Sequence, residues 1–421
     1  MQSNTPKKQD APWRNRDYLL LWSGQGLSSL GDVLQDVPLP LLILALTHSP
    51  AQAGIVATLQ KLPFPFLSLP AGVLIDRWDR KRVMIICDIG RALAAGSVFL
   101  AYWLRHLSMP HIYLMALVCG ALATFFTLAE TASLPNVVSK EHLPAAMGQN
   151  YATSIATGII GAPLGGLLYA FYAALPFLLN ALSYLISVLS LSTIRTQFQQ
   201  VRQTTQRNFR QEIQEGVAWI WRQPLVRFLA FRVSAGNIAY GGSTLILIML
   251  AQNLHASAFE IGIIFTIDAL GGIAASFLIE PLQRRLSFTH ITIGLGWVAA
   301  LLFPLYALAP NIFLLGLIGA LMSFALVIFD VTQLSYRASI IPDSIFGRVT
   351  SSIRLLTVGA ISLGAAIAGI MLQLFGPINT VYSFSAYLFV LALLTTLNKD
   401  IRQAGSLSET EMTLEEDTQV G

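Results

Sequence analysis

Long apolar stretches separated by short polar segments run along almost the whole chain. Each is about 20–30 residues long, which is the length that an α-helix needs to cross a bilayer. Polar and apolar residues do not alternate as they do in the strands of a membrane barrel, so we expect helices throughout. The pattern predicts twelve spanning helices, at residues 17–46, 51–75, 83–104, 110–134, 145–172, 175–195, 224–252, 256–281, 288–308, 311–336, 345–374 and 377–398.

The twelve predicted helices form two sets of six. A polar, basic stretch separates the sets, and it ends in EGVAWIWRQPLVRF, whose pattern is typical of an amphipathic helix on a membrane surface. The segment VVSKEHLPAAMGQNYATSI after the fourth helix resembles SIIPDSIFGRVTSSI after the tenth. Paired six-helix halves are typical of one large class of secondary transporters. The predicted parts are an N-terminal segment (1–16), a first bundle (17–195), a linker with the amphipathic helix (196–223), a second bundle (224–398) and an acidic tail (399–421).

Composition and charge support a protein embedded in the cell membrane. Hydrophobic residues make up 54% of the chain and charged residues 11%, whereas a soluble chain typically carries about 25% charged residues. The first sixteen residues are polar and basic without an apolar core, so we expect no cleavable signal peptide. Lysines and arginines gather in the loops on one side, and the opposite loops carry only Arg105. The positive-inside rule therefore predicts a multi-pass protein with both termini in the cytoplasm.

Polar residues of the first predicted helix fall on one face. Gln25, Ser29, Asp32 and Asp36 are spaced by four, three and four positions, which places them in one stripe. An ionised carboxylate at mid-depth costs about 2.5–3.5 kcal/mol on insertion scales. The stripe is therefore expected to face a cavity and not lipid.

Other intramembrane polar residues point to the same cavity. Glu130 in the fourth helix and Asp330 in the tenth are near-equivalent at an offset of 199 to 202 positions. A carboxyl group in a low-dielectric cavity takes up a proton readily, as proton-coupled transport requires. The alternative is an interior acid that only locks helices together, which is the expectation for Asp268. The predicted proton and substrate cavity comprises Gln25, Asp32, Asp36, Glu130, Asn237, Tyr240 and Asp330.

The string GVLIDRWDRKRVMIICDIGRAL between the second and third helices resembles a loop of the major facilitator superfamily, G-x-x-x-D-R-x-G-R-R/K. Asp79 stands where that pattern has glycine. Gly31–Asp32, Asp88 with Arg91, and PDSIFGRV resemble the superfamily's branch of drug and siderophore exporters, which includes macrolide efflux pumps and the enterobactin exporter. The residues that match the loop pattern are Gly72, Asp76, Arg77, Arg80 and Lys81.

The resemblance implies a fold and a role for this loop. The fold is an all-α membrane protein with twelve transmembrane helices in two pseudo-symmetric six-helix bundles around a central cavity. The loop would be a cytoplasmic latch in which Asp76 faces the end of helix 11, and the alternative is a plain positive-inside signal. Asp88 and Arg91, spaced i, i+3, are expected to form a structural pair joined to the latch.

Glycines of the fifth helix leave two interpretations open. Gly158, Gly161, Pro163, Gly165 and Gly166 approximate a pattern of the superfamily's antiporters, with the proline and the glycine pair displaced. The same residues suit a small-residue face on which two helices approach closely.

No motif of an enzyme is present: the sequence contains no phosphate-binding Walker loop, no H-E-x-x-H, no G-x-S-x-G and no dinucleotide fingerprint. The histidines have no metal spacing, so no cofactor or metal is expected. The predicted function is secondary export of lipophilic or amphiphilic small molecules (drug, macrolide or siderophore-like) by proton antiport and alternating access.

The expected partners are the substrate, protons and the bilayer, without nucleic acid, and the protein is expected to be a monomer. The helices expected to line the cavity carry acids and aromatic residues but no spanning arginine other than Arg91, which favours neutral or cationic amphiphiles over phosphates or sugar acids. The alternatives are a lysophospholipid or lipid transporter of the same fold, and a membrane sensor that does not transport.

Overall fold

The computed structural model describes residues 15–139, 141–196, 198 and 209–404, and all regular structure in this part of the chain is helical. The chain folds into two compact units. The first comprises Met1–Pro38 and Phe66–Thr205, and the second comprises Leu39–Pro65 and Gln206–Gly421. The predicted N-terminal segment, acidic tail and linker lie for the most part outside the described residues.

Most helices of the first unit begin at a polar or proline residue, as expected where backbone N–H groups lack intrahelical partners. The Asn15 side chain accepts from the backbone of Asp17 at 3.0 Å, and the Asp79 side chain accepts from that of Arg82 at 3.1 Å. α1 packs against α7 and α8, and α5 packs against α6 and α8. The helices are α1 (Arg16–Asp36), α4 (Pro63–Arg77), α5 (Arg80–Trp103), α6 (Met109–Val137), α7 (Leu143–Phe171) and α8 (Leu175–Thr193).

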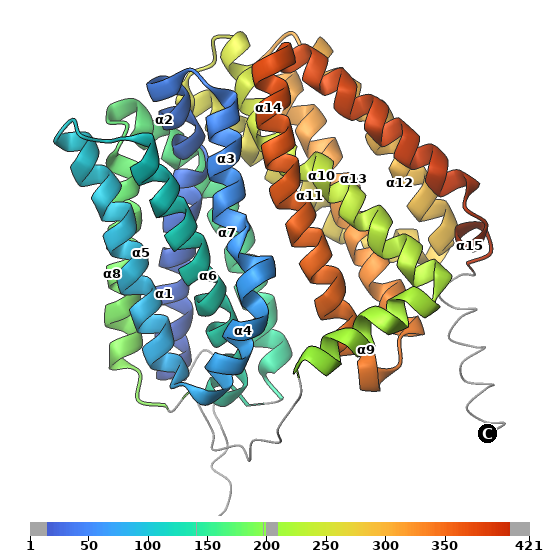
Figure 1. Ribbon diagram of the computed structural model, residues 1–421, viewed down its shortest axis with the longest axis horizontal. Helices are drawn as coiled ribbons and strands as arrows, with labels where there is room; N and C mark the ends of the chain where they lie inside the picture. The colour runs from blue at the N-terminus through green and yellow to red at the C-terminus, as the bar shows by residue number, and fades with distance from the viewer. Residues whose placement is uncertain (1–14, 140, 197, 199–208, 405–421) are drawn as a thin grey trace, which may run out of the picture. The chain divides into compact units, whose positions relative to one another are not determined.

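The second unit is built mainly from the contacts of α10 with α14 and of α11 with α13 (Figure 1). A capping box between Ser257 and Glu260 begins α11. Its helices are α2 (Pro38–Thr47), α3 (Pro50–Lys61), α9 (Phe209–Arg222), α10 (Pro224–Asn253), α11 (Ala258–Arg285), α12 (Phe288–Leu302), the 3₁₀ helix η2 (Phe303–Leu308), α13 (Ile312–Ile340), α14 (Asp343–Leu397) and α15 (Lys399–Arg402).

α14 contains two crossings. Its spanning part, Ile345–Leu397, has 53 residues, which is about 80 Å of helix at 1.5 Å per residue and far more than one bilayer. Gly376 has φ 74°, a left-handed conformation that glycine adopts at little cost, and Pro377 follows it. Figure 1 shows the helix reversing direction into two arms.

Twelve crossings follow once the helix breaks are taken into account. Ten stretches of the described residues are long and apolar enough to span a membrane, and one of these is the double crossing of α14. α3 and α4 together cover the second predicted span but are interrupted at Pro63. The first span is likewise divided, into α1 and α2 at Pro38, since proline cannot donate the next helical hydrogen bond. The all-α prediction and its twelve helices are confirmed, although the first two spans are not single helices.

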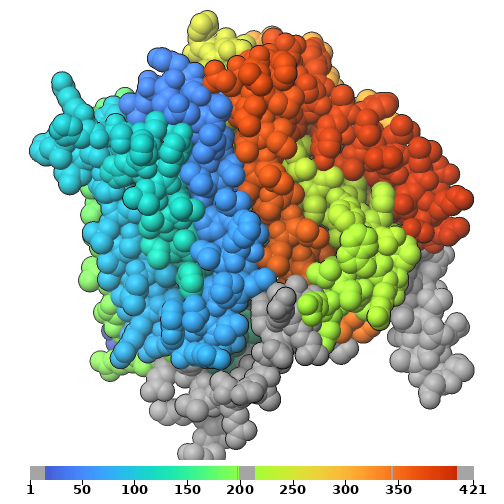
Figure 2. All heavy atoms as spheres, in the orientation of Figure 1, coloured from blue at the N-terminus to red at the C-terminus, as the bar shows by residue number. Residues whose placement is uncertain are grey.

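α3 packs on the first arm of α14 within the second unit. A Cβ on Gly54 would lie 2.8 Å from the Cα of Gly369, so the two backbones touch where neither has a side chain. The Thr58 hydroxyl donates to the carbonyl of Ser362 at 2.9 Å. Figure 2 shows the two helices adjoining, one blue and the other orange. These contacts group residues 39–65 with the second unit, and the bundle boundaries at 17–195 and 224–398 remain a prediction.

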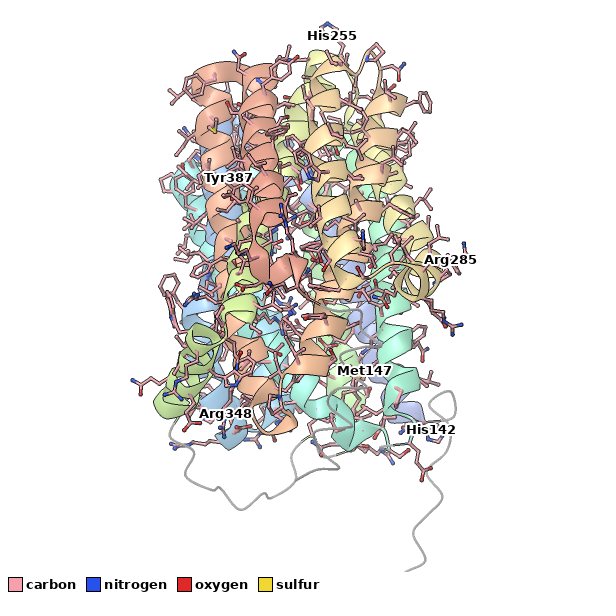
Figure 3. All side chains as sticks on the ribbon, turned by 90° about the vertical axis from the view of Figure 1, so that its right-hand side faces the viewer. His142, Met147, His255, Arg285, Arg348 and Tyr387 are labelled. Atoms are coloured by element: carbon pink, nitrogen blue, oxygen red, sulfur yellow. The ribbon has the colours of Figure 1, made fainter. Side chains whose placement is uncertain are left out.

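α9 lies directly before the seventh span, where the sequence predicts an amphipathic helix. Ile220 is buried against Val349 and Ile353 of α14. An ion pair of 2.6 Å joins Glu215 of α9 to Arg348, which is labelled in Figure 3. The helix is therefore anchored to α14, and its position on the cytoplasmic surface remains a prediction.

The glycines of α7 form a packing face. A Cβ on Gly161 would lie 2.7 Å from a methyl carbon of Val33, and one on Gly165 would lie 3.0 Å from the carbonyl carbon of Leu34. Both contacts are to α1. Of the two interpretations of this stretch, close helix packing is the one that the contacts support.

Candidate functional site

Arg91 lies at the centre of a charged cluster in the first unit. It forms an ion pair with Asp88, one turn earlier on α5, and the two residues are 4% and 0% exposed. The guanidinium group also lies between the rings of Phe126 from α6 and Tyr184 from α8, at 4.4 Å from each ring centroid. Two aromatic faces and a carboxylate together replace the water that this cation loses on burial.

Asp32 completes the cluster from α1. Its carboxylate lies 3.7 Å from Nη1 of Arg91 and accepts a hydrogen bond from the Tyr184 hydroxyl. The Asp32 side chain is 44% exposed, whereas that of Asp88 is fully buried. Asp32 is therefore the acid of the pair that water and protons can reach.

The cluster opens into a pocket of about 220 Å³ in the first unit. Three residues predicted for the cavity line it together, namely Gln25, Asp32 and Glu130. Arg91 is the only basic residue in the described lining. With Asp88 beside it, the pocket thus contains more acidic than basic side chains. Asp36 does not take part, because it is the exposed last residue of α1.

The assignment of Asp88 and Arg91 to the latch is corrected. The two residues form the predicted pair, but Arg91 is eleven residues beyond the start of α5, about 16 Å along the helix, and its ion-pair partners in the described residues are Asp88 and Asp32, neither of which belongs to the loop. The sequence prediction joined both residues to the loop because they follow it closely along the chain. Closeness along a helix does not mean that the side chains are in contact.

The latch residues themselves tie helix ends of the first unit. Arg80 pairs with Asp76 at 3.4 Å and donates to the carbonyl of Ala132 at 2.6 Å. Lys81 donates to the carbonyl of Ile194 at 2.7 Å. Arg77 ends α4, and a side chain on Gly72 would meet open space. A gating role for the loop remains a prediction.

A second pocket, of about 180 Å³, lies in the second unit. Asn237 and Tyr240 of α10 and Asp330 of α13, all predicted for the cavity, line it together. Asp268 of α11 lines it as well, although the sequence favours a purely structural acid there. The predicted cavity residues thus fall into two sets, each in the pocket of its own unit.

Arg232 also lines the second pocket, and the sequence analysis missed it. It is 8% exposed, its Cζ lies 4.6 Å from the centroid of the Phe329 ring, and its Nε donates to Thr395 at 3.1 Å. The prediction that the cavity helices carry no spanning arginine other than Arg91 was wrong, because Arg232 lies two turns inside α10 and lines this pocket.

The two pockets are related by the internal repeat. Phe126 and Phe329, each under a guanidinium group, are 203 positions apart, and so are Tyr184 and Tyr387. Tyr387, labelled in Figure 3, donates to the carbonyl of Ala235 at 2.9 Å. Ala235 is itself 203 positions after Asp32, the acceptor of Tyr184.

This register corrects the equivalence of the two cavity acids. At an offset of 203 positions, Asp330 corresponds to Thr127, and Glu130 corresponds to Gln333. The acids are thus displaced by about one helical turn, because the sequence comparison at 199 to 202 positions had no contact to fix the register.

Tyr184 is the other residue that the sequence analysis missed. A signal was present: Asn180, Ser183, Ser187 and Ser190 form a polar stripe with spacings of three, four and three positions on α8. Gln25 donates to Ser187 at 3.3 Å, so this face meets α1. A polar face on each of two helices predicts their contact, but not which aromatic residue lies beside it.

Comparisons with known proteins bear on the family and the fold. The family model described as transmembrane secretion effector matches residues 8–416. An uncharacterised major-facilitator-type transporter of Bacillus subtilis (strain 168), YfiS, is 29% identical over 221 residues, covering 51% of this chain and 52% of that one. Macrolide efflux protein A of Streptococcus pyogenes is 24% identical over 208 residues, covering 49% and 51%. The chain therefore spans about half the length of these two relatives.

The enterobactin exporter EntS of Escherichia coli O1:K1 / APEC is similar over a longer range. It is 25% identical over 376 residues, which cover 88% of both chains. Among solved structures, a variant of the nucleoside transporter NupG superposes with a TM-score of 0.76 at 15% identity, over 90% of this chain and 99% of that one. This likeness shows the fold.

Proposed function

Because the chain belongs to the transmembrane secretion effector family, which makes it a multi-pass secondary transporter of the major facilitator superfamily and not an enzyme, we propose that it exports a lipophilic or amphiphilic small molecule in exchange for protons. Macrolide efflux protein A and the enterobactin exporter EntS support the outward direction and the substrate class. The loop charges support a chain in the cell membrane with both termini in the cytoplasm.

One observation supports proton coupling most directly. Asp32 is an accessible acid beside the buried ion pair of Asp88 and Arg91, whose charges already neutralise each other. Asp88 alone neutralises Arg91, so an ionised Asp32 adds a second negative charge in a low-dielectric environment. Uptake of one proton by Asp32 removes that excess charge. The protonated form no longer attracts Arg91 at 3.7 Å, which weakens the link between α1 and α5.

This change in a helix contact can serve alternating access. The ionised form of Asp32 holds α1 to Arg91, and the protonated form weakens this link. A transporter whose two access states differ in this contact would couple the uptake and release of one proton to the exposure of its substrate site. Tyr184 keeps the carboxyl group oriented in both forms, since a phenol can donate to either.

The test is proton-coupled transport in proteoliposomes with an imposed pH gradient. The probes are a macrolide, a catecholate siderophore and ethidium, chosen as a neutral-to-basic, an acidic and a cationic amphiphile. Asp32→Asn is expected to abolish the gradient-driven component for any transported probe. Asp36→Asn is the matched control, because it makes the same change on the same helix outside the pocket.

The same assay separates the alternatives. If Asp32→Asn shows gradient-driven transport at the wild-type rate, Asp32 is not the residue that couples transport to protons. If no probe moves in wild-type vesicles but a fluorescent lysophospholipid does, the lipid transporter is the better description. If none of these compounds is transported under any gradient, a membrane sensor that does not transport is the better description.

A further inference from the structure

We propose that the pocket of the second unit binds the anionic group of an amphiphilic ligand, a carboxylate, sulfonate or phosphate, and that Arg232 binds it. The inference rests on the proposed function in that it names a chemical feature of the substrate. It replaces the expectation of neutral or cationic amphiphiles, which depended on the absence of this arginine.

Arg232 presents the unused part of its guanidinium group to the pocket. The residue is more than nine-tenths buried, and its Nε donates to Thr395. Within the described residues, neither Nη atom has a hydrogen-bond partner and no carboxylate lies within ion-pair distance. A guanidinium group has two parallel N–H donors on its outer edge, which match the two oxygens of a carboxylate or sulfonate.

The helices around Arg232 provide almost no compensating charge. α10, α12 with η2, and the second arm of α14 contain no Asp or Glu. Asp330 of α13 is the one carboxylate in electrostatic reach, and it is shared with Arg337. Asp268 contacts Ser323 instead. Arg232 therefore has no carboxylate in ion-pair contact within the described residues, and a buried guanidinium group without such a partner is costly in a membrane interior until an anion arrives.

The first unit provides a comparison, because its buried arginine, Arg91, is paired with carboxylates. Phe126 and Phe329 are equivalent, and each lies under a guanidinium group. In the first unit the acceptor of the repeat tyrosine is the carboxylate of Asp32, and in the second it is the backbone of Ala235. The second unit thus keeps the aromatic support for a cation, but no carboxylate of the described residues is paired with Arg232 as Asp32 and Asp88 are paired with Arg91.

The remaining lining suits the rest of an amphiphile. Apolar walls are formed by Leu247, Phe265 and Phe303, and hydroxyl groups by Ser243 and Thr244. Apolar walls with one placed charge are the usual composition of a small-molecule site.

Two glycines leave room for the guanidinium group. A Cβ on Gly236 would lie 3.2 Å from Nη1 of Arg232, and one on Gly296 would lie 3.2 Å from Nη2. The lack of a side chain at these two positions lets the guanidinium nitrogens lie close to the backbones of α10 and α12.

The experiment measures equilibrium binding to the full-length protein in lipid nanodiscs, without a gradient, with empty discs subtracted. The probes are 1-anilinonaphthalene-8-sulfonate and N-phenyl-1-naphthylamine, which differ only in the sulfonate. Wild type is expected to bind the sulfonate about tenfold or more tightly than the amine. Arg232→Gln is expected to lose this preference, and Arg232→Lys to keep only the part that comes from charge without the two-donor geometry. Arg285→Gln is the control, because it removes an exposed arginine outside the pocket.

The variant Asp330→Asn gives an independent reading, since removing the competing carboxylate should tighten sulfonate binding. Equal affinity of wild type for the two probes would overturn the inference, whether or not Arg232→Gln folds. So would unchanged sulfonate binding by a folded Arg232→Gln protein. If Asp32→Asn transports normally while the wild type still prefers the sulfonate probe, the proposal of proton coupling through Asp32 is wrong and the anion site stands. If export is proton-coupled but the wild type does not prefer the sulfonate probe, the anion site is wrong and the proposed function stands.

Discussion

The hydroxyl of Tyr184 donates to the carboxylate of Asp32, 152 positions earlier in the chain. Tyr387 makes the equivalent bond across the same 152 positions, but to the backbone of Ala235. The repeat has therefore conserved a tyrosine and its geometry within one chain, while the acceptor differs in charge. In the first unit this bond belongs to a titratable cluster, and in the second it holds two helices together.

Replacement of Tyr184 by Phe is expected to slow gradient-driven transport by about fivefold or more, because the hydroxyl orients Asp32 towards Arg91. Tyr387→Phe is the matched control, and it should keep proton coupling, since its acceptor does not titrate. Initial rates in proteoliposomes with and without a pH gradient give the coupled component of each variant. Equal loss in both variants would mean that the bond matters only for packing.

Asp88→Asn is expected to destabilise the protein by about 3–5 kcal/mol, since it breaks a fully buried ion pair and leaves Arg91 with a partner at 3.7 Å. Asp32→Asn should cost about 1 kcal/mol or less, because Asp32 is partly exposed and Arg91 keeps Asp88. The free energies of unfolding can be compared by titration with sodium dodecyl sulfate.

The double replacement Asp88→Asn with Arg91→Gln is the control for this stability prediction. It removes the uncompensated cation and should recover a large part of the loss. A single replacement of Asp88 that unfolds like the wild type would show that the buried pair contributes nothing to stability.

Gly165→Ala is expected to cost about 1–3 kcal/mol of stability, because its Cβ would lie against the backbone of Leu34, which cannot move aside as a side chain can. Gly158→Ala on the same helix meets nothing within 4 Å and should be neutral or stabilising, since alanine favours a helix over glycine. Thermal unfolding in detergent distinguishes the two. If Gly165→Ala unfolds like the wild type but loses transport, the antiporter interpretation of this stretch regains support.

The sequence predicts the helices because hydropathy reports on the solvent, and the bilayer is the same for every span. Prolines at positions 38 and 63 interrupt the first two spans, and their effect depends on local geometry that hydropathy does not contain. Asp32 was found because a polar stripe on a spanning helix needs a partner or a cavity.

The partners of Asp32 could not be found in the same way. Arg91, Phe126 and Tyr184 lie on three different helices, and only packing brings them together. Arg232 was misplaced because it follows the basic linker closely and was counted with the linker charges, although the predicted seventh span already begins at residue 224. The equivalence of Glu130 with Asp330 failed by one turn because weak internal similarity tolerates small shifts of register.

The double replacement Glu130→Gln with Asp330→Asn tests whether the two cavity acids form one site. Two nearby carboxylates would resist joint ionisation, so neutralising one would alter the other and the combined effect would be less than additive. The surroundings of each acid within its own unit lead us to expect the opposite result. Glu130 lines the pocket with Asp32 and Arg91, whereas Asp330 lies between Arg232 and Arg337. Each acid thus has its own charged neighbours.

We therefore expect the two effects on probe affinity and on the pH midpoint of transport to add within about 0.3–0.5 kcal/mol, as for independent sites. Asp36→Asn, combined with each single variant in turn, gives the baseline for a carboxylate outside both pockets. A coupling energy well above that baseline on either measure would contradict separate sites. It would also indicate that the two acids contact one ligand.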